Sequence, residues 1–141
     1  MNALLDTNVI VDVLTAREPF FADSSAVLDL AERGAYVASL CATTVTTVYF
    51  LVRRHHGANA TLEKIKDLAA ICEVVPVNRA VIESALDSGF GDFEDAVLNH
   101  SALLAGADCI VTRNESDFRA SSLLIYTPAQ FLGALREKTG S

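Results

Sequence analysis

Short runs of apolar, often β-branched residues alternate along this chain with longer stretches in which apolar residues recur every three or four positions. This alternation predicts strands buried on both faces and joined by helices, the pattern of β-α units stacked around a parallel sheet. We therefore expect a single α/β domain over residues 1–141 with four to five strands. The predicted strands are Ala3–Leu5, Tyr36–Leu40, Glu73–Val77, Cys109–Thr112 and, as a fifth, Leu123–Tyr126.

Capping residues and glycines mark the ends of the helical stretches. The predicted helices are one that begins near Val9, then Asp23–Arg33, Thr43–His56, Thr61–Cys72, one from Asn78 through Leu86, one from Asp92 through Ala105, and a last one opened by Thr127 and Pro128. In folds of this kind, ligands bind outside the carboxyl ends of the strands. The residues that follow each strand are therefore the candidates for function.

Composition narrows the class of protein. Hydrophobic residues make up 51% of the chain and the mean hydropathy is +0.33, which excludes a disordered chain. No apolar run has the length of a membrane span, and the first residues lack the basic segment of a signal peptide. The three cysteines are far apart and form no C-x-x-C pair, so we expect buried free thiols. We expect a cytoplasmic protein that does not associate with membranes.

The net charge of −7 is unusual for a protein that binds nucleic acid, which commonly carries a basic surface. The acids are unevenly distributed, because residues 80–118 contain eight acids and one base. Such a local excess either attracts cations or forms a solvated acidic surface. Charge alone does not distinguish these alternatives.

Two acidic clusters follow predicted strand ends or open predicted helices. Asp6 directly follows the first strand, where it can act as a metal ligand or cap the next helix. Asp92 and Asp95 lie one helical turn apart and can face the same way, although a capping arrangement with acids in the first turn explains them too. Glu94 is a third acid in that turn.

A third cluster follows the fourth strand, in the segment TRNESDF over residues 112–118. Asp117 and the side-chain carbonyl of Asn114 could reach a cation beyond the strand end, or the segment could be a polar loop. Taken together, oxygen ligands without paired Cys or His suit Mg²⁺ or Mn²⁺ better than zinc. Such sites ionise water and hold a phosphoryl oxygen, the chemistry of nucleases and phosphatases.

The segments LLDTNVIVD, DFEDAV and IVTRNESDF, in this order and spacing, resemble the PIN domain family, and within it the toxin ribonucleases of VapC type. The resemblance covers nearly the whole chain. It implies a three-layer α/β/α sandwich, an endoribonuclease that depends on Mg²⁺ or Mn²⁺, an RNA substrate, an antitoxin partner and a homodimer.

The resemblance also assigns roles to individual residues. The metal ligands that we expect are Asp6, Asp95, Asp117 and Asn114. The catalytic acids that we expect are Asp6, Asp92, Asp95 and Asp117, with Asp92 acting through a bound water. The residues that we expect to contact substrate are Thr7, Asn8, Thr112 and Arg113.

One position departs from the family pattern. The family usually carries an acid on the helix after the second strand, where Thr47 stands here. This departure supports an alternative hypothesis, a catalytically weakened or inactive module that binds RNA or a partner. A phosphatase with Asp6 as nucleophile is a further alternative, but such sites usually have a second acid two residues later, and this chain has Asn8 there.

Overall fold

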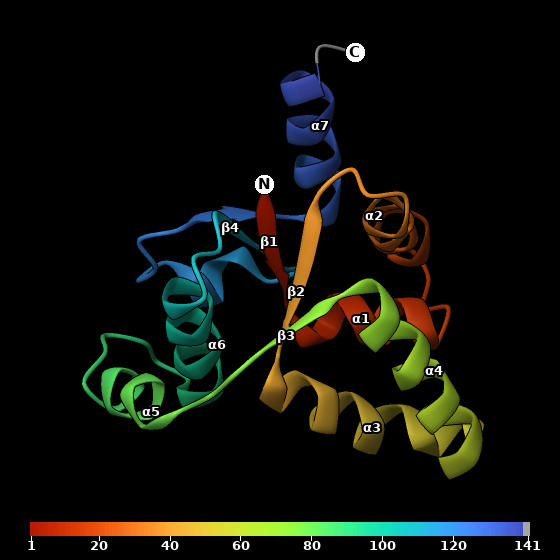
Figure 1. The fold of residues 1–141 in the computed structure, drawn as a ribbon, viewed down its shortest axis with the longest axis horizontal. Coiled ribbons are helices and arrows are strands. Elements are labelled where there is room, and N and C mark those ends of the chain that lie inside the picture. Colours follow the sequence, from red (N-terminus) through yellow and green to blue (C-terminus); the bar gives the residue numbers. More distant parts are fainter. Residues whose placement is uncertain (140–141) are drawn as a thin grey trace.

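A central sheet of five parallel strands organises the molecule (Figure 1). The computed structural model describes residues 1–139. The strand order is β3-β2-β1-β4-β5, so β1 is the middle strand. The strands are β1 (Asn2–Leu5), β2 (Val37–Cys41), β3 (Glu73–Val75), β4 (Cys109–Val111) and β5 (Leu124–Tyr126).

Helices cover both faces of this sheet. The helices are α1 (Thr7–Leu14), α2 (Phe21–Glu32), α3 (Ala42–His56), α4 (Ala58–Ile71), α5 (Arg79–Leu86), α6 (Phe93–Leu104) and α7 (Pro128–Thr139), with a 3-10 helix η1 (Glu115–Phe118). Helices α5 and α6 lie on one side of the strands, and α1, α2 and α4 lie on the other (Figure 1).

Strands β1, β2, β4 and β5 each contribute to two separate hydrophobic cores, because successive side chains of a strand point to opposite faces. Leu4 and Ile110 pack with α5, α6 and η1. Leu5 and Val111 pack with α1, α2, α3, α4 and α7. The predicted three-layer α/β/α sandwich with a parallel sheet of four to five strands is therefore confirmed.

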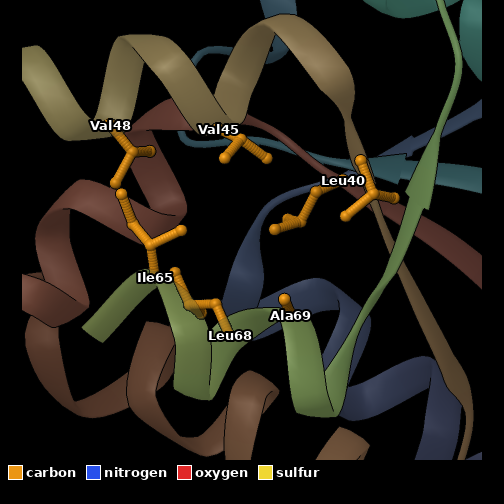
Figure 2. A pocket seen from close by; sticks show the side chains of 7 residues that line it. Leu40, Val45, Val48, Ile65, Leu68 and Ala69 are labelled. Atoms are coloured by element: carbon orange, nitrogen blue, oxygen red, sulfur yellow. The ribbon is translucent and has the colours of Figure 1, made fainter. Parts of the chain in front are cut away.

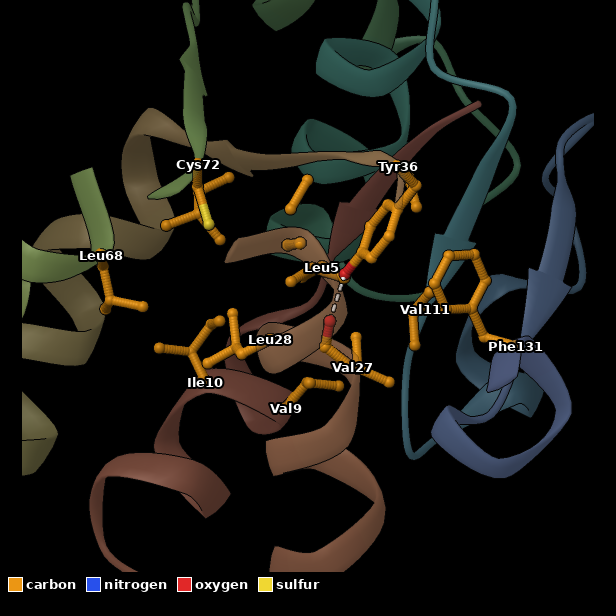
Figure 3. Packing of buried hydrophobic residues seen from close by; sticks show 14 of the residues in the cluster. Leu5, Val9, Ile10, Val27, Leu28, Tyr36, Leu68, Cys72, Val111 and Phe131 are labelled. Atoms are coloured by element: carbon orange, nitrogen blue, oxygen red, sulfur yellow. Dashed lines mark hydrogen bonds between the residues drawn. The ribbon is translucent and has the colours of Figure 1, made fainter. Parts of the chain in front are cut away.

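The larger core is organised around Tyr36, which precedes β2 (Figure 3). The Tyr36 hydroxyl donates a hydrogen bond to the Val27 carbonyl at 2.8 Å, so its polar atom has a partner inside the core. Its ring packs edge-on against the Phe131 ring, with centroids 4.8 Å apart. This contact joins α2 and α7 to the sheet.

Helices α3 and α4 form a hairpin that closes over β2 and β3 (Figure 2). A cavity of about 30 Å³ remains beneath it, and apolar side chains alone line it: Leu40, Val45, Val48, Ile65, Leu68, Ala69 and Val74. The cavity offers no polar group to a ligand, so it belongs to the packing of the domain.

Most element ends lie within one or two residues of their predicted positions, and three of the differences have identifiable reasons. The first helix begins at Thr7, because Asp6 is its N-cap. Helix α4 begins at Ala58, directly after Gly57. Strand β3 ends at Val75, because the following proline has no N–H to donate. In residues 1–139, no helix has the length and apolar character needed to cross a membrane.

Candidate active site

Asp6 stands at the carboxyl end of the middle strand and opens α1. Its backbone N–H donates to the Val111 carbonyl at 2.9 Å, which continues the pairing of β1 with β4. Its Oδ1 accepts from the Thr7 N–H and its Oδ2 from the Thr112 hydroxyl, each at 2.7 Å. A carboxylate has about four acceptor positions, so Asp6 can cap the helix and still offer oxygen atoms to a cation. Burial raises the pKa of Asp6, and the Thr112 hydrogen bond opposes that rise.

The N-terminus of α6 carries the second acidic cluster. The Asp92 Oδ1 accepts a hydrogen bond from the Asp95 N–H at 2.9 Å. Asp92 is therefore the N-cap of α6, as its position in the sequence predicted. Burial is the main reason that the pKa of Asp95 is raised to about 7, and the carboxylates of Asp6, Asp92, Asp117 and Glu94 contribute the rest of the rise. These acids therefore lie close enough to repel one another, and a bound cation would relieve that repulsion.

The third cluster is attached to the end of β4 by side-chain hydrogen bonds. The buried Thr112 hydroxyl accepts from the Asn114 N–H at 3.0 Å while it donates to Asp6. The Asn8 side-chain carbonyl accepts from the Arg113 N–H at 3.2 Å. These bonds hold the segment after β4 against the start of α1.

Asp117 lies on the 3-10 helix η1 in this same segment. Phe118, next to it, is 1% exposed and anchors η1 in the core. The Asp117 N–H donates to the Asn114 carbonyl at 3.1 Å. Asp117 is therefore held at the carboxyl edge of the sheet by its neighbours and not by a strand or a long helix.

The three clusters meet around one pocket of about 400 Å³. Its lining consists of Asp6, Thr7, Asn8, Val11, Asp12, Arg17, Thr47, Leu51, Asp92, Glu94, Asp95, Arg113, Asn114 and Asp117. All the expected metal ligands and catalytic acids are in this lining. Of the four residues expected to contact substrate, Thr112 alone is absent from it. Thr112 is fully buried and its hydroxyl holds Asp6 in place.

An ion pair that the sequence did not indicate lies at the base of this pocket. The Arg113 Nε donates to the Asp12 Oδ2 at 2.7 Å, and Nη2 lies 3.3 Å from Oδ1. The Asp12 side chain is 1% exposed and that of Arg113 is 23% exposed. The Arg113 guanidinium also lies over the Phe20 ring, 4.1 Å from its centroid. Arg113 was expected to contact substrate, and in this structure its guanidinium is paired with Asp12.

For three further residues that line the pocket, the sequence gives a weak indication of a functional position or none. Glu94 resembles an ordinary exposed residue of a first helical turn. Arg17 follows Ala16, whose φ of 50° no sequence pattern marks. Thr47 had been singled out as the position of a missing acid, and it does line the pocket, with its hydroxyl donating to the Thr43 carbonyl at 3.0 Å.

The donor set suits a hard divalent cation, because the pocket offers carboxylate and amide oxygens and contains neither His nor Cys. Within residues 1–139, no three His, Cys, Asp or Glu side chains are grouped so that they could hold one ion between them. Mg²⁺ commonly binds through one or two carboxylates and keeps several waters. The pocket thus fits an ion that is partly hydrated better than one fully enclosed by protein.

The crowded carboxyl of Asp95 should make the metal-free protein less stable as the pH rises. Its pKa of about 7 in the folded chain exceeds the ordinary value near 4, so the folded state binds the proton more tightly. Stability from this group is present below about pH 4 and is lost as the pH rises towards about 7. With EDTA present, Asp95→Asn should therefore stabilise the protein at pH 8 by about 1–2 kcal/mol, after allowance for solvent screening of a half-buried group.

Thermal unfolding in EDTA at pH 5 and pH 8 measures this effect. Asp67→Asn is the control, because it removes the same charge from an exposed site on α4. A stability difference between wild type and Asp95→Asn that is the same at both pH values would contradict the raised pKa of Asp95.

Comparison with known proteins identifies relatives of this chain. The sequence profile described as PIN domain matches residues 2–116, which include every candidate acid except Asp117. Ribonuclease VapC1 from Aquifex aeolicus is 26% identical over 132 residues, which cover 90% of each chain.

Solved structures share the fold. VapBC2 from Rickettsia felis, bound to a DNA fragment from its promoter, has a TM-score of 0.69 at 14% identity and covers 90% of this chain and 98% of that one. A toxin-antitoxin complex from Klebsiella pneumoniae has a TM-score of 0.67 at 19% identity and covers 89% of this chain and 97% of that one. With the profile match spanning most of its length, this chain belongs to the PIN domain family.

Proposed function

We propose that this protein is a metal-dependent endoribonuclease that hydrolyses RNA phosphodiester bonds, and that it is the toxin of a toxin–antitoxin pair. The observation that carries the proposal is the meeting of acids from three distant segments in one pocket, where burial and the neighbouring carboxylates together raise the pKa of Asp95 to about 7. The similarity to a ribonuclease, VapC1, supports the choice of RNA as substrate.

In this proposal Asp6, Asp95, Asp117 and Asn114 hold a partly hydrated Mg²⁺ or Mn²⁺, one or two of them by direct contact and the others through its waters. When bound, such an ion lowers the pKa of a coordinated water and stabilises negative charge on a phosphoryl oxygen. Thr112 fixes the orientation of the Asp6 carboxylate through its 2.7 Å hydrogen bond, as groups behind metal ligands commonly do.

The remaining lining residues have supporting roles in the proposal. Asp92 and Glu94 accept hydrogen bonds from waters around the ion and help to align the attacking water. Thr7 and Asn8 sit at the N-terminus of α1, where their polar groups can contact the substrate backbone. Arg113 keeps the segment after β4 close to α1 through its pair with Asp12.

We also propose an antitoxin protein as partner, because the related structures from Rickettsia felis and Klebsiella pneumoniae are described as VapBC2 and as a toxin-antitoxin complex. A homodimer belongs to the same proposal. The cytoplasm is the proposed compartment, and the three cysteines, which are buried and free, suit a reducing environment.

Thr47 favours the second candidate function, a PIN-like module that binds RNA or a partner without cleaving it. Thr47 lines the pocket where the resembling family usually has an acid, and its hydroxyl donates to the Thr43 carbonyl, so it adds no charge there. Cleavage assays distinguish the two functions directly.

We expect RNA cleavage in the presence of Mg²⁺ or Mn²⁺ and none in EDTA. Purified protein is incubated with mixed RNA and each metal, with and without chelator, and the products are separated by size. Asp6→Asn protein, prepared in the same way, reveals contaminating nucleases. Cleavage that persists in chelator, or that is equal in both proteins, would refute the metal-dependent mechanism.

Restoring an acid at position 47 should strengthen the metal site. Thr47→Glu adds a carboxylate to the pocket lining, and divalent affinity rises with the number of ligand charges. We expect Mn²⁺ to bind about tenfold more tightly by calorimetry, with faster cleavage at limiting metal.

Thr46→Glu is the matched control for this experiment. Thr46 is the exposed neighbour, and its hydroxyl also donates to the Thr43 carbonyl at 3.0 Å. Equal Mn²⁺ affinity in the two variants would mean that position 47 lies outside the metal site. If Asp6→Asn nevertheless abolishes binding, the site is complete without an acid there.

A further inference from the structure

Two arginines, Arg17 and Arg113, line the pocket that contains the acids, and they differ in whether they form an ion pair. The Arg113 guanidinium is paired with the buried Asp12. Arg17 is exposed, and its guanidinium contacts the Phe20 ring, 5.9 Å from the centroid. Within residues 1–139, Arg17 forms no ion pair, although six carboxylates lie in the same lining. A cation that is left unpaired beside so many acids is free to bind an anion.

The backbone around Arg17 is firmly placed. Its N–H donates to the Asp12 carbonyl at 2.9 Å, and its carbonyl accepts from the Phe20 N–H at 3.0 Å. Ala16 turns the chain there with a left-handed φ of 50°. The turn therefore holds Arg17 at the pocket while its guanidinium keeps its hydrogen-bond donors available.

A third arginine, Arg119, lies in a hollow next to the pocket. A shallow hollow of about 460 Å³ adjoins the pocket and shares Arg113 and Asn114 with it. Arg119 lines this hollow, is exposed, and forms no ion pair among the described residues. Phe20 connects Arg17 to Arg113, and the hollow connects Arg113 to Arg119. We call these three residues the arginine row.

We propose that the arginine row binds the phosphates next to the scissile one, so that the RNA backbone leaves the pocket over this flank. This inference rests on the proposed ribonuclease function and adds how the substrate is held. The chain is acidic overall, so an approaching RNA meets repulsion except where unpaired cations stand. Arginine suits the role, because its planar guanidinium donates two parallel hydrogen bonds to a phosphate. Arg17 and Arg119 contact the phosphates, and Arg113 lies between them.

Arg17→Gln and Arg119→Gln, singly and together, test this proposal. Each should raise KM for a short fluorescent RNA of mixed sequence about five- to tenfold and leave kcat within about twofold, since the lost contact is to a phosphate that does not react. Each should also make the dependence of log K on log salt concentration shallower by about 0.7, the value for one phosphate contact on a single strand. Arg33→Gln is the control, because it removes the same charge before β2, at the opposite edge of the sheet.

The outcomes separate this proposal from the proposed function. If wild type cleaves RNA and both Arg17→Gln and Arg119→Gln show the same KM and salt dependence as the Arg33→Gln control, the arginine row is overturned. A loss of kcat with unchanged KM would overturn it too, because the arginines would then act on the reacting phosphate. The arginine row would be supported and the nuclease refuted if wild type binds this RNA without cleaving it and the salt dependence of binding becomes shallower by about 0.7 in Arg17→Gln.

Discussion

Replacing Asp6 with asparagine should lower the rate of RNA cleavage at least about a hundredfold and leave the fold intact. Mutating a group that only hydrogen-bonds to a metal ligand typically lowers metal affinity or activity by 10- to 100-fold. The loss of a direct ligand should lower activity at least as much. Asp6 is the least exposed of the acids that face the pocket from the sheet edge and the start of α6, and it directly follows the middle strand. Its carboxylate therefore has the best-defined position.

The variant should fold, because asparagine preserves the local hydrogen bonds. The side-chain carbonyl can accept from the Thr7 N–H, and the amide can donate to the Thr112 hydroxyl, which now acts as acceptor. The melting temperature in EDTA should equal or exceed that of wild type, since one of several repelling charges is gone. A clearly lower melting temperature with cleavage retained would show that Asp6 is only a helix cap.

Asp108→Asn is the matched control. Asp108 precedes β4 at the amino edge of the sheet, where its Oδ2 accepts from the Asn2 N–H at 2.8 Å. The same substitution at that edge should change neither Mn²⁺ affinity nor cleavage. Calorimetry, cleavage rates and thermal unfolding of the three proteins together distinguish a metal ligand from a structural aspartate.

Arg113→Leu should destabilise the protein by about 3–5 kcal/mol, the usual cost of removing one partner of a buried ion pair. Asp12 is 0% exposed, and within residues 1–139 Arg113 is the one cation that forms an ion pair with its carboxylate. The variant also loses the contact of the guanidinium with the Phe20 ring at 4.1 Å. Urea denaturation should show a lower midpoint with an unchanged slope.

The double variant Asp12→Leu/Arg113→Leu should recover most of this stability, because apolar side chains of similar size often replace a buried pair without loss. Arg79→Leu provides the comparison, since it removes one partner of an exposed pair with Glu83 and should cost less than about 1 kcal/mol. If Arg113→Leu costs no more than Arg79→Leu, the Asp12 carboxylate has another source of stabilisation and the pair is not structural.

The order and type of the elements could be predicted from the sequence because caps and periodicity are local properties. Asn78 accepts a hydrogen bond from the Val81 N–H at 3.0 Å and Asp92 from the Asp95 N–H at 2.9 Å, both as their positions before helical stretches indicated. Errors arose where a local signal was misjudged. Thr61 was read as a helix start, whereas its hydroxyl donates to the Gly57 carbonyl from inside α4.

The sequence by itself determined that acids would gather at the carboxyl edge of a parallel sheet, since strand ends and the residues after them are readable in order along the chain. Only the tertiary structure decided which of these groups touch. Thr112 bonds Asp6 across 106 positions and Arg113 pairs with Asp12 across 101. Both contacts exist because β4 lies beside β1 in the sheet. That adjacency results from how helices on both faces pack, and no local pattern near either residue encodes it.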